Sequence, residues 1–166
     1  MNRIPLVAAT ILIEVGCATI PQPVRTYVGP ELPAQAVALI DGVLPQPSEN
    51  SQRLDTGGVY IPCINGVSLE RHLGAYDNGG RWPNKLTVIP GRHYLAVLYD
   101  FPRGQKASWA SVALDVEAGR QYIVKREVKG ESVRMWVEDT ANGMVVAAAT
   151  PMSNEGPKRD AVKPCP

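Results

Sequence analysis

The sequence has few of the residues from which catalytic, metal and nucleic-acid sites are usually built. Its 166 residues include two histidines, three cysteines and one phenylalanine, and the formal net charge is +1. A chain with so little excess charge and no long run of lysines or arginines lacks the field that attracts nucleic acid, so we expect no nucleic-acid partner. It also has no His-x-x-x-His or Cys-x-x-Cys spacing, and we therefore expect no metal and no cofactor.

The motifs of common hydrolases and nucleotide-binding enzymes are missing as well. There is no Gly-x-Ser-x-Gly elbow and no glycine-rich phosphate loop. The adjacent acids Glu138 and Asp139 fall in a predicted strand, where neighbouring side chains point to opposite faces, so they are not placed for shared acid–base work. We therefore expect no catalysis. A triad assembled around His72 or His93 from distant residues is not excluded by spacing along the chain.

A long helical pattern is also missing, whereas short alternating runs are frequent. Fifteen prolines and fifteen glycines divide the chain into short segments. SWASVALDV (108–116) alternates as a half-buried strand does, and HYLAVLY (93–99) is apolar on both faces, as in a central strand. The pattern predicts an all-β fold in one domain, an antiparallel β-sandwich of about seven to eight short strands. The predicted strands lie within 36–42, 59–69, 85–91, 93–99, 108–116, 121–128, 132–139 and 144–149.

The N-terminal segment has the pattern of an export signal. Arg3 is followed by an apolar stretch from Ile4 to Ile13 and then by small residues. The stretch is too short to cross a hydrocarbon core of about 30 Å as a helix, so we do not expect a transmembrane anchor.

Val15-Gly16-Cys17 resembles the lipobox of bacterial lipoproteins. The resemblance implies a lipoprotein signal peptide of residues 1–16 and a diacylated Cys17 that attaches the exported chain to a membrane. Glu14 departs from this motif, which usually has leucine there. A plain secretory signal cut after Ala18 and an uncleaved buried segment remain as alternatives.

Three parts follow the predicted signal peptide. Residues 17–33 are punctuated by prolines and are expected to form an extended tether. Residues 34–150 contain the predicted strands and form the β-sandwich domain, and residues 151–166 form a C-terminal tail.

We expect a disulfide between two of the three cysteines. If Cys17 carries lipid, Cys63 and Cys165 remain as an even pair in an oxidising compartment. A bridge closing a loop of about 100 residues stabilises by about 4.7 kcal/mol in the chain-entropy model. The alternative is that the two thiols are unrelated.

Two stretches of the chain echo each other. VIPGRHYLAV (88–97) and VEAGRQYIVK (116–125) share a valine, a glycine, an arginine and a tyrosine in register. Gln121 stands in the second copy where His93 stands in the first. The pattern therefore does not require an imidazole, and we interpret His93 as a strand residue next to a turn.

The tryptophans offer the best candidate for a binding surface. Trp109 and Trp136 fall on the more polar faces of their predicted strands. If these strands are neighbours, the two indoles form a platform beside Arg134 and Glu138 that suits a glycan or a peptide. The alternative is that the indoles serve only packing. Trp82, in a predicted loop, is expected to be exposed.

Three stretches carry a resemblance to a family: YVGPELPAQAVALIDG (27–42), VIPGRHYLAVLYD (88–100) and VEAGRQYIVKREV together with MWVEDTANGMVV (116–146). They resemble a group of small bacterial envelope lipoproteins with no assigned reaction, which share Tyr-x-Gly-Pro-x-Leu-Pro, Pro-Gly-Arg-His and Trp-x-Glu-Asp. The Pro-Gly turn is also similar to PEGA-type and transthyretin-like β-sandwich modules. The resemblance implies an anchored sandwich, and it gives no catalytic residues to carry over to this chain. The 45–58 loop, Cys63 and the tail ending in Cys165 are not part of it.

These observations favour a lipid-anchored β-sandwich that acts as a structural or protein-interaction module of the cell envelope, with another envelope protein as partner. Ala18 rather than aspartate follows the modified cysteine, which by the lipoprotein rule implies the outer membrane, facing the periplasm. The alternative is a small-ligand binding protein that uses the Trp109 and Trp136 face for a glycan or peptide.

Overall fold

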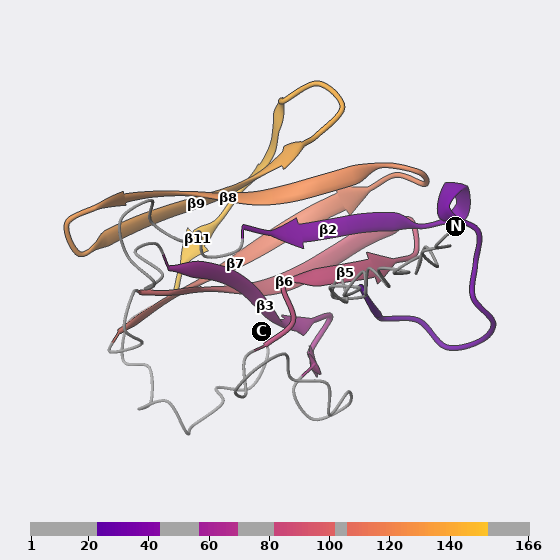
Figure 1. Cartoon of the computed structure of the whole chain (residues 1–166), viewed down its shortest axis with the longest axis horizontal. Coiled ribbons are helices and arrows are strands. Elements are labelled where there is room, and N and C mark those ends of the chain that lie inside the picture. Colours follow the sequence, from indigo (N-terminus) through magenta and orange to yellow (C-terminus); the bar gives the residue numbers. More distant parts are fainter. Residues whose placement is uncertain (1–22, 44–56, 70–81, 102–105, 153–166) are drawn as a thin grey trace, which may run out of the picture.

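Two β-sheets face each other across a common core in the computed structural model, which describes residues 23–43, 57–69, 82–101 and 106–152 (Figure 1). A short 3₁₀ helix, η1 (Ala34–Ala36), precedes the first long strand. One sheet has six strands in the order β1 (Val24–Arg25), β5 (Lys85–Val88), β2 (Ala38–Gly42), β8 (Gln121–Lys129), β9 (Ser132–Asp139) and β10 (Val145–Ala148). The other has five strands in the order β11 (Thr150–Pro151), β7 (Ala107–Val116), β6 (Gly91–Asp100), β3 (Gly58–Ile64) and β4 (Val67–Ser68).

The prediction of an all-β, sandwich-like fold is confirmed, but the prediction of a purely antiparallel one is wrong. The five-stranded sheet is antiparallel, whereas β1–β5 and β2–β8 pair in parallel. Asp41 and Gln121, which share a hydrogen bond across the β2–β8 pair, are 80 residues apart, and no local pattern reports such a pairing. The strand count also exceeds the predicted seven to eight, because β1, β4 and β11 have two residues each and are too short to show alternation.

The core is formed by the alternating residues that face the space between the sheets. Ala110, Val112, Leu114 and Val116 of β7 all belong to it, as their spacing predicted. In β6, Leu95, Val97 and Tyr99 face the core, while Ala96 and Leu98 on the opposite face are buried as well. β6 lies between β7 and β3, which confirms that it is a central strand.

The two sheets are joined along both of their sides. On one side a single residue, Ala149, separates β10 in the six-stranded sheet from β11 in the five-stranded sheet. On the other side, the amides of Val59 and Ile61 in β3 donate to the carbonyls of Val43 and Pro83, at 2.8 Å each. These two carbonyl residues lie just after β2 and before β5. The sandwich is therefore held together by backbone bonds as well as by its core.

The predicted tether is partly in the sheet. Val24 and Arg25 pair with Leu86 and Thr87 of β5, and the amide of Thr26 donates to the carbonyl of Thr87. The predicted signal peptide, Cys17, His72 and Cys165 lie outside the described residues. Among the residues that are described, no helix has the length and apolar character needed to cross a bilayer.

Candidate interaction site

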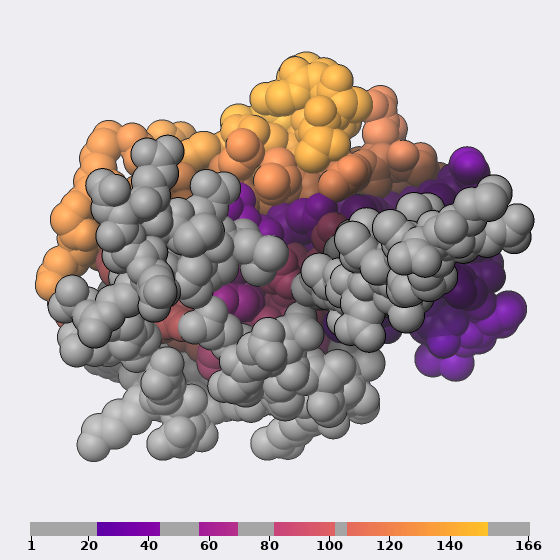
Figure 2. Space-filling model, in the orientation of Figure 1, coloured from indigo at the N-terminus to yellow at the C-terminus, as the bar shows by residue number. Residues whose placement is uncertain are grey.

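Three consecutive apolar residues are exposed where β9 turns back into β10. Met144, Val145 and Val146 have relative exposures of 63%, 59% and 45%. The end of this hairpin stands out from the body of the molecule in orange and yellow (Figure 2). A single exposed apolar side chain is common on protein surfaces, whereas a continuous group of them is typical of a contact surface.

A groove of about 400 Å³ lies beside this strand. It exists because β10 follows one sheet and β11 the other. β11 pairs with β7 only at Ala110 and Ser111, so beyond these residues β7 and β10 diverge. The pairing of β10 with β9 shifts between Val145 and Ala147, and a bulge of this kind bends a strand away from its sheet. The groove is lined by Tyr94, Leu95, Ser111, Val112, Ala113, Val146, Ala147, Ala148 and Thr150.

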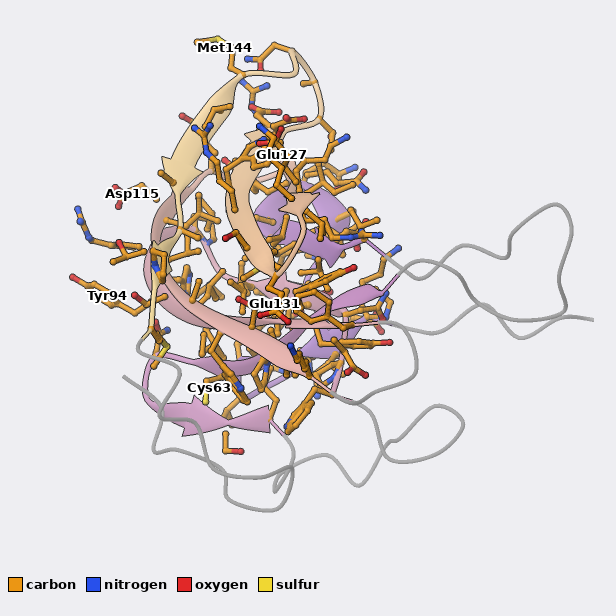
Figure 3. The ribbon with its side chains drawn as sticks, turned by 90° about the vertical axis from the view of Figure 1, so that its left-hand side faces the viewer. Cys63, Tyr94, Asp115, Glu127, Glu131 and Met144 are labelled. Carbon is orange, nitrogen blue, oxygen red and sulfur yellow. The ribbon has the colours of Figure 1, made fainter. Side chains whose placement is uncertain are left out.

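The rim of the groove carries the polar groups. Tyr94 is half exposed, and it projects from the same side of the molecule as Asp115 (Figure 3). Arg92 is 3.4 Å from the carboxylate of Asp115 and lies over the ring of Tyr94, 5.8 Å from its centroid. The site is therefore an apolar cleft with hydroxyl and charged groups at its edge, which suits the binding of an extended segment of protein.

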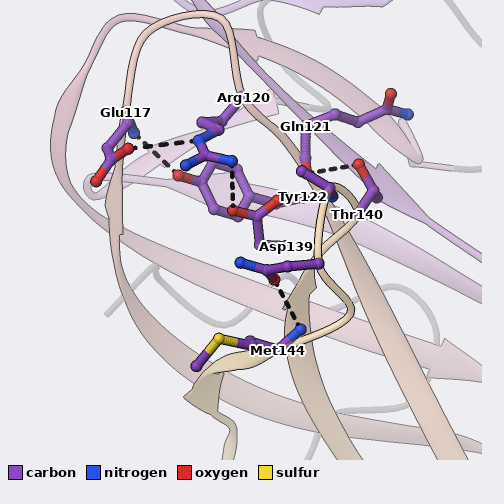
Figure 4. A network of polar contacts seen from close by, with 9 residues as sticks. Glu117, Arg120, Gln121, Tyr122, Asp139, Thr140 and Met144 are labelled. Carbon is purple, nitrogen blue, oxygen red and sulfur yellow. Dashed lines mark hydrogen bonds and ion pairs between the residues drawn. The ribbon is translucent and has the colours of Figure 1, made fainter.

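A polar network holds the hairpin in place (Figure 4). Arg120, in the turn between β7 and β8, is 3.4 Å from the carboxylates of both Glu117 and Asp139. Asp139 is buried at the end of β9, and its Oδ1 accepts a hydrogen bond from the amide of Ala141 at 2.8 Å. The hydroxyl of Tyr122 accepts a hydrogen bond from the amide of Glu117 at 3.0 Å. The two neighbouring turns are thus tied together.

The same network fixes the residues that lead into β10. The hydroxyl of Thr140 donates to the carbonyl of Gln121 at 3.0 Å, and the side-chain oxygen of Asn142 accepts from the amide of Met144 at 2.9 Å. The apolar residues from Met144 onward are therefore presented by an ordered turn.

His93 is a strand residue, as predicted, but its ring has two specific partners. Nε2 is 2.8 Å from the carbonyl oxygen of Ile89, and Nδ1 is 2.9 Å from the side-chain nitrogen of Asn65. Since the carbonyl only accepts and the amide nitrogen only donates, the ring carries its proton on Nε2. His93 therefore joins the turn before β6 to the turn after β3. These two hydrogen bonds are specific to the first copy of the echo, which has His93 where the second copy has Gln121.

The two tryptophans expected to form a platform are in different sheets. Trp109 is in β7 and Trp136 is in β9, and neither belongs to the core between the sheets. Trp109 instead packs edge-on against Trp82, with ring centroids 5.7 Å apart. Trp82 is half-buried rather than exposed. The condition on which the shared platform depended, neighbouring strands, is not met.

The remaining members of that predicted face are together around Trp136. Its indole Nε1 donates to Glu138 at 2.7 Å, and the guanidinium of Arg134 lies 5.9 Å from the ring centroid. Lys125 of β8 is 3.7 Å from the carboxylate of Glu138. These groups satisfy one another, so the outer surface of the six-stranded sheet is a network of paired charges.

At the far end of β8 the charges are also paired. Lys129 donates a hydrogen bond to Glu127, and this bond together with the lysine charge lowers the pKa of Glu127 below its ordinary value of 4.5. Both side chains are on the surface, so the pair contributes little to stability.

Among the described ranges, no cluster of three or more histidine, cysteine or acidic residues is placed to hold a metal ion. Cys63 is buried in β3, and its predicted partner Cys165 is outside the described residues, so the disulfide stays a prediction. No protein-family model matches the chain, and neither do any curated protein or solved structure.

The exposed residues at the start of β10 were not identified from the sequence. MVVAAA (144–149) was predicted only as a strand after a hairpin turn. The signal for exposure was its position directly after a hairpin turn and at the end of the series of strands, which favours an edge.

Proposed function

We propose that the protein is a lipid-anchored module of the bacterial cell envelope that binds another envelope protein and carries out no reaction. The observation that supports the interaction is the exposed apolar surface of Met144, Val145 and Val146 beside the groove. An edge strand next to an apolar groove suits a partner segment in extended conformation, because backbone pairing and side-chain insertion occur together.

The anchor rests on the sequence. Diacylated Cys17 would hold the domain at the outer membrane, with residues 18–22 between the lipid and the first described residue. One acyl chain binds a membrane only marginally, whereas two or more give stable attachment. Cys17→Ser is expected to move the protein from the membrane fraction to the soluble periplasm. Unchanged fractionation would reject the anchor.

The interaction surface is tested by crosslinking in intact cells. Val145→Lys is expected to remove the crosslinked partner, because a charge on the exposed face opposes burial against an apolar surface. Val128→Lys is the matched control, since Val128 is also an exposed valine of the six-stranded sheet, at the end of β8. Loss of the partner in both variants, or in neither, would reject the assignment of the surface.

The alternative function, a binding protein for a glycan or peptide, required both Trp109 and Trp136 on one surface. The structure places these residues in separate sheets, so this alternative would have to rest on Trp136 alone. Its ring is already in contact with Arg134 and Glu138. We therefore favour the interaction module.

A further inference from the structure

Part of the face of the five-stranded sheet that points away from the core is also buried. Tyr60, Leu98 and Trp109 form one row across β3, β6 and β7, because Tyr60 is paired with Leu98 and Leu98 with Trp109. Their strand neighbours belong to the core between the sheets, so these three side chains project from the opposite face. Tyr60 and Leu98 are nevertheless only 4% and 1% exposed. Trp82 packs against Trp109 at one end of the row, and Tyr60 and Leu98 are covered as well.

A second row, of smaller side chains, runs beside the first. Cys63 is paired with Ala96, Ala96 with Ser111, and Ser111 with Thr150. Tyr60, Leu98 and Trp109 stand on one side of this row, and Tyr94 stands on the other side along β6. The small residues therefore form a trough that crosses the sheet from β11 to Cys63. Cys63 and Tyr94 lie along the same side of the molecule in Figure 3.

The chain leaves the described structure at one end of this trough. The amide of Met152 donates to the carbonyl of Trp109 at 3.0 Å, directly after β11. The distance across the sheet from β11 to β3 is three strand spacings, about 14 Å. Cys165 lies thirteen positions after Met152 in the sequence, and an extended chain spanning thirteen positions reaches about 43 Å. The core blocks the inner face, so a path from Met152 to Cys63 crosses the outer face.

We propose that the C-terminal segment 153–166 docks in this trough and is fixed there by a disulfide between Cys165 and Cys63. The segment begins at one end of the trough and has its cysteine within reach of the other. Ala161, Val162 and Pro164 just before that cysteine supply apolar atoms for the row of Tyr60, Leu98 and Trp109. This inference requires no partner, but it rests on the proposed export to an oxidising compartment, and the trough shares Ser111 and Thr150 with the groove of the proposed interaction site.

The bond forms by thiol–disulfide exchange. The two thiols together lose two protons and two electrons as the sulfur–sulfur bond forms. A protein disulfide of the envelope takes up the two protons and the two electrons and becomes a dithiol. Reduction reverses the step and is expected to release the segment, which would uncover Tyr60, Leu98 and Trp109 as a second apolar surface.

The linkage is tested on the oxidised, exported chain by trypsin digestion without reduction. Cleavage after Arg53, Arg71 and Arg159 yields a peptide of residues 54–71, which contains Cys63, and one of residues 160–166, which contains Cys165. We expect mass spectrometry to find these two peptides joined and to separate them after reduction. Free thiols at both positions, or Cys63 joined to Cys17, would overturn the proposal.

The path of the segment is tested by filling the trough. Trypsin cleavage at Lys158 and Arg159 is expected to be at least about tenfold faster in the reduced protein than in the oxidised one, because cleavage follows the population of the released segment. Ser111→Phe places a ring in the trough and is expected to accelerate cleavage of the oxidised protein by a similar factor. Ser132→Phe, an exposed position of β9 in the other sheet, is the matched control and should leave the rate unchanged.

Equal cleavage rates in the Ser111→Phe and Ser132→Phe proteins would show that the segment does not run through the trough. Equal rates in the oxidised and reduced wild-type protein would show the same without any substitution, so the test does not depend on the folding of a variant.

Discussion

At the scale of single residues, the two echoing stretches share a glycine with positive φ, but the strands that they form bury alternate positions of the shared pattern. Gly91 and Gly119 both have positive φ, at 131° and 73°. Gly91 is the first residue of β6, and Gly119 lies two residues before the start of β8. In β6, however, His93 is buried and Tyr94 exposed, whereas in β8 Gln121 is exposed and Tyr122 buried. The sequence pattern identified the turn glycines correctly. It did not show that the two strands leave their turns one residue out of phase.

The two positions of the echo are therefore expected to differ in their effect on stability. His93→Leu removes two partly buried hydrogen bonds, to the carbonyl of Ile89 and the side chain of Asn65. At about 0.5–1.5 kcal/mol for each bond, the loss of stability is expected to be about 1–3 kcal/mol. Gln121→Leu removes only an exposed hydrogen bond to Asp41 and is expected to change stability by about 0.5 kcal/mol or less. Urea unfolding of both variants measures the difference in the free energy of unfolding. An equal loss in both would mean that His93 and Gln121 contribute equally to stability and would contradict the prediction.

Glu131 offers a pH-dependent test at the same scale. The hydrogen bond from Lys106 and the charge of that ammonium lower the pKa of Glu131 below its ordinary value of 4.5. A lowered pKa in the folded state stabilises the fold above the unfolded-state pKa, and this contribution disappears as the pH falls through the folded-state value. Because both groups are exposed, the shift should shrink in about 1 M salt.

An NMR titration of the Glu131 carboxyl measures this shift directly. Lys106→Met is the control and should return the pKa to its ordinary value at low salt. A lowered pKa that survives in this variant would assign the effect to another group.

At the scale of the elements, the sequence revealed the long strands and missed their partners. β7 and β9 alternate clearly, and their inward residues, such as Leu114 and Val137, are where the pattern placed them. The parallel pair β2–β8 and the separation of Trp109 from Trp136 depend on which sheet each strand joins. That choice is made by contacts between residues far apart in the chain, so local periodicity does not contain it. The candidate groove was missed for the same reason.

Gly42, at the end of β2, is expected to tolerate no side chain. A Cβ there would overlap the carbonyl oxygen of Val59, which belongs to the backbone of the facing sheet and has little room to move. Gly42→Ala is therefore expected to destabilise the fold by about 3 kcal/mol or more. Gly130, in the β8–β9 turn, has φ of 61° and open space around it, so Gly130→Ala should cost only the conformational penalty of about 1–2 kcal/mol.

The comparison of these two variants by urea unfolding separates steric overlap from backbone strain. A similar loss of stability in both would mean that β2 and β3 are not in close approach, and would contradict the hydrogen bonds that join the two sheets on that side.

At the scale of the whole molecule, the two sheets are joined by hydrogen bonds between backbone segments on one side and by the chain crossing from β10 to β11 on the other. The first side has backbone bonds between β3 and the segments beside β2 and β5. The other side has the β10–β11 crossing and, next to it, the groove. The interaction surface thus lies on the side where the chain itself crosses between the sheets, next to the free edge of β10, where an added strand meets little competition.

This asymmetry is expected to appear in native-state hydrogen exchange. Amides of β6, whose strand has neighbours on both sides and buried residues on both faces, should exchange only through global unfolding and be the slowest. Amides of β10 and β11, at the edges of their sheets and largely exposed, should exchange through local opening and be faster by orders of magnitude. If β10 were instead protected to the same degree as β6, the two would open as one unit. The side of the molecule beside the groove would then not have the lower local stability expected of it.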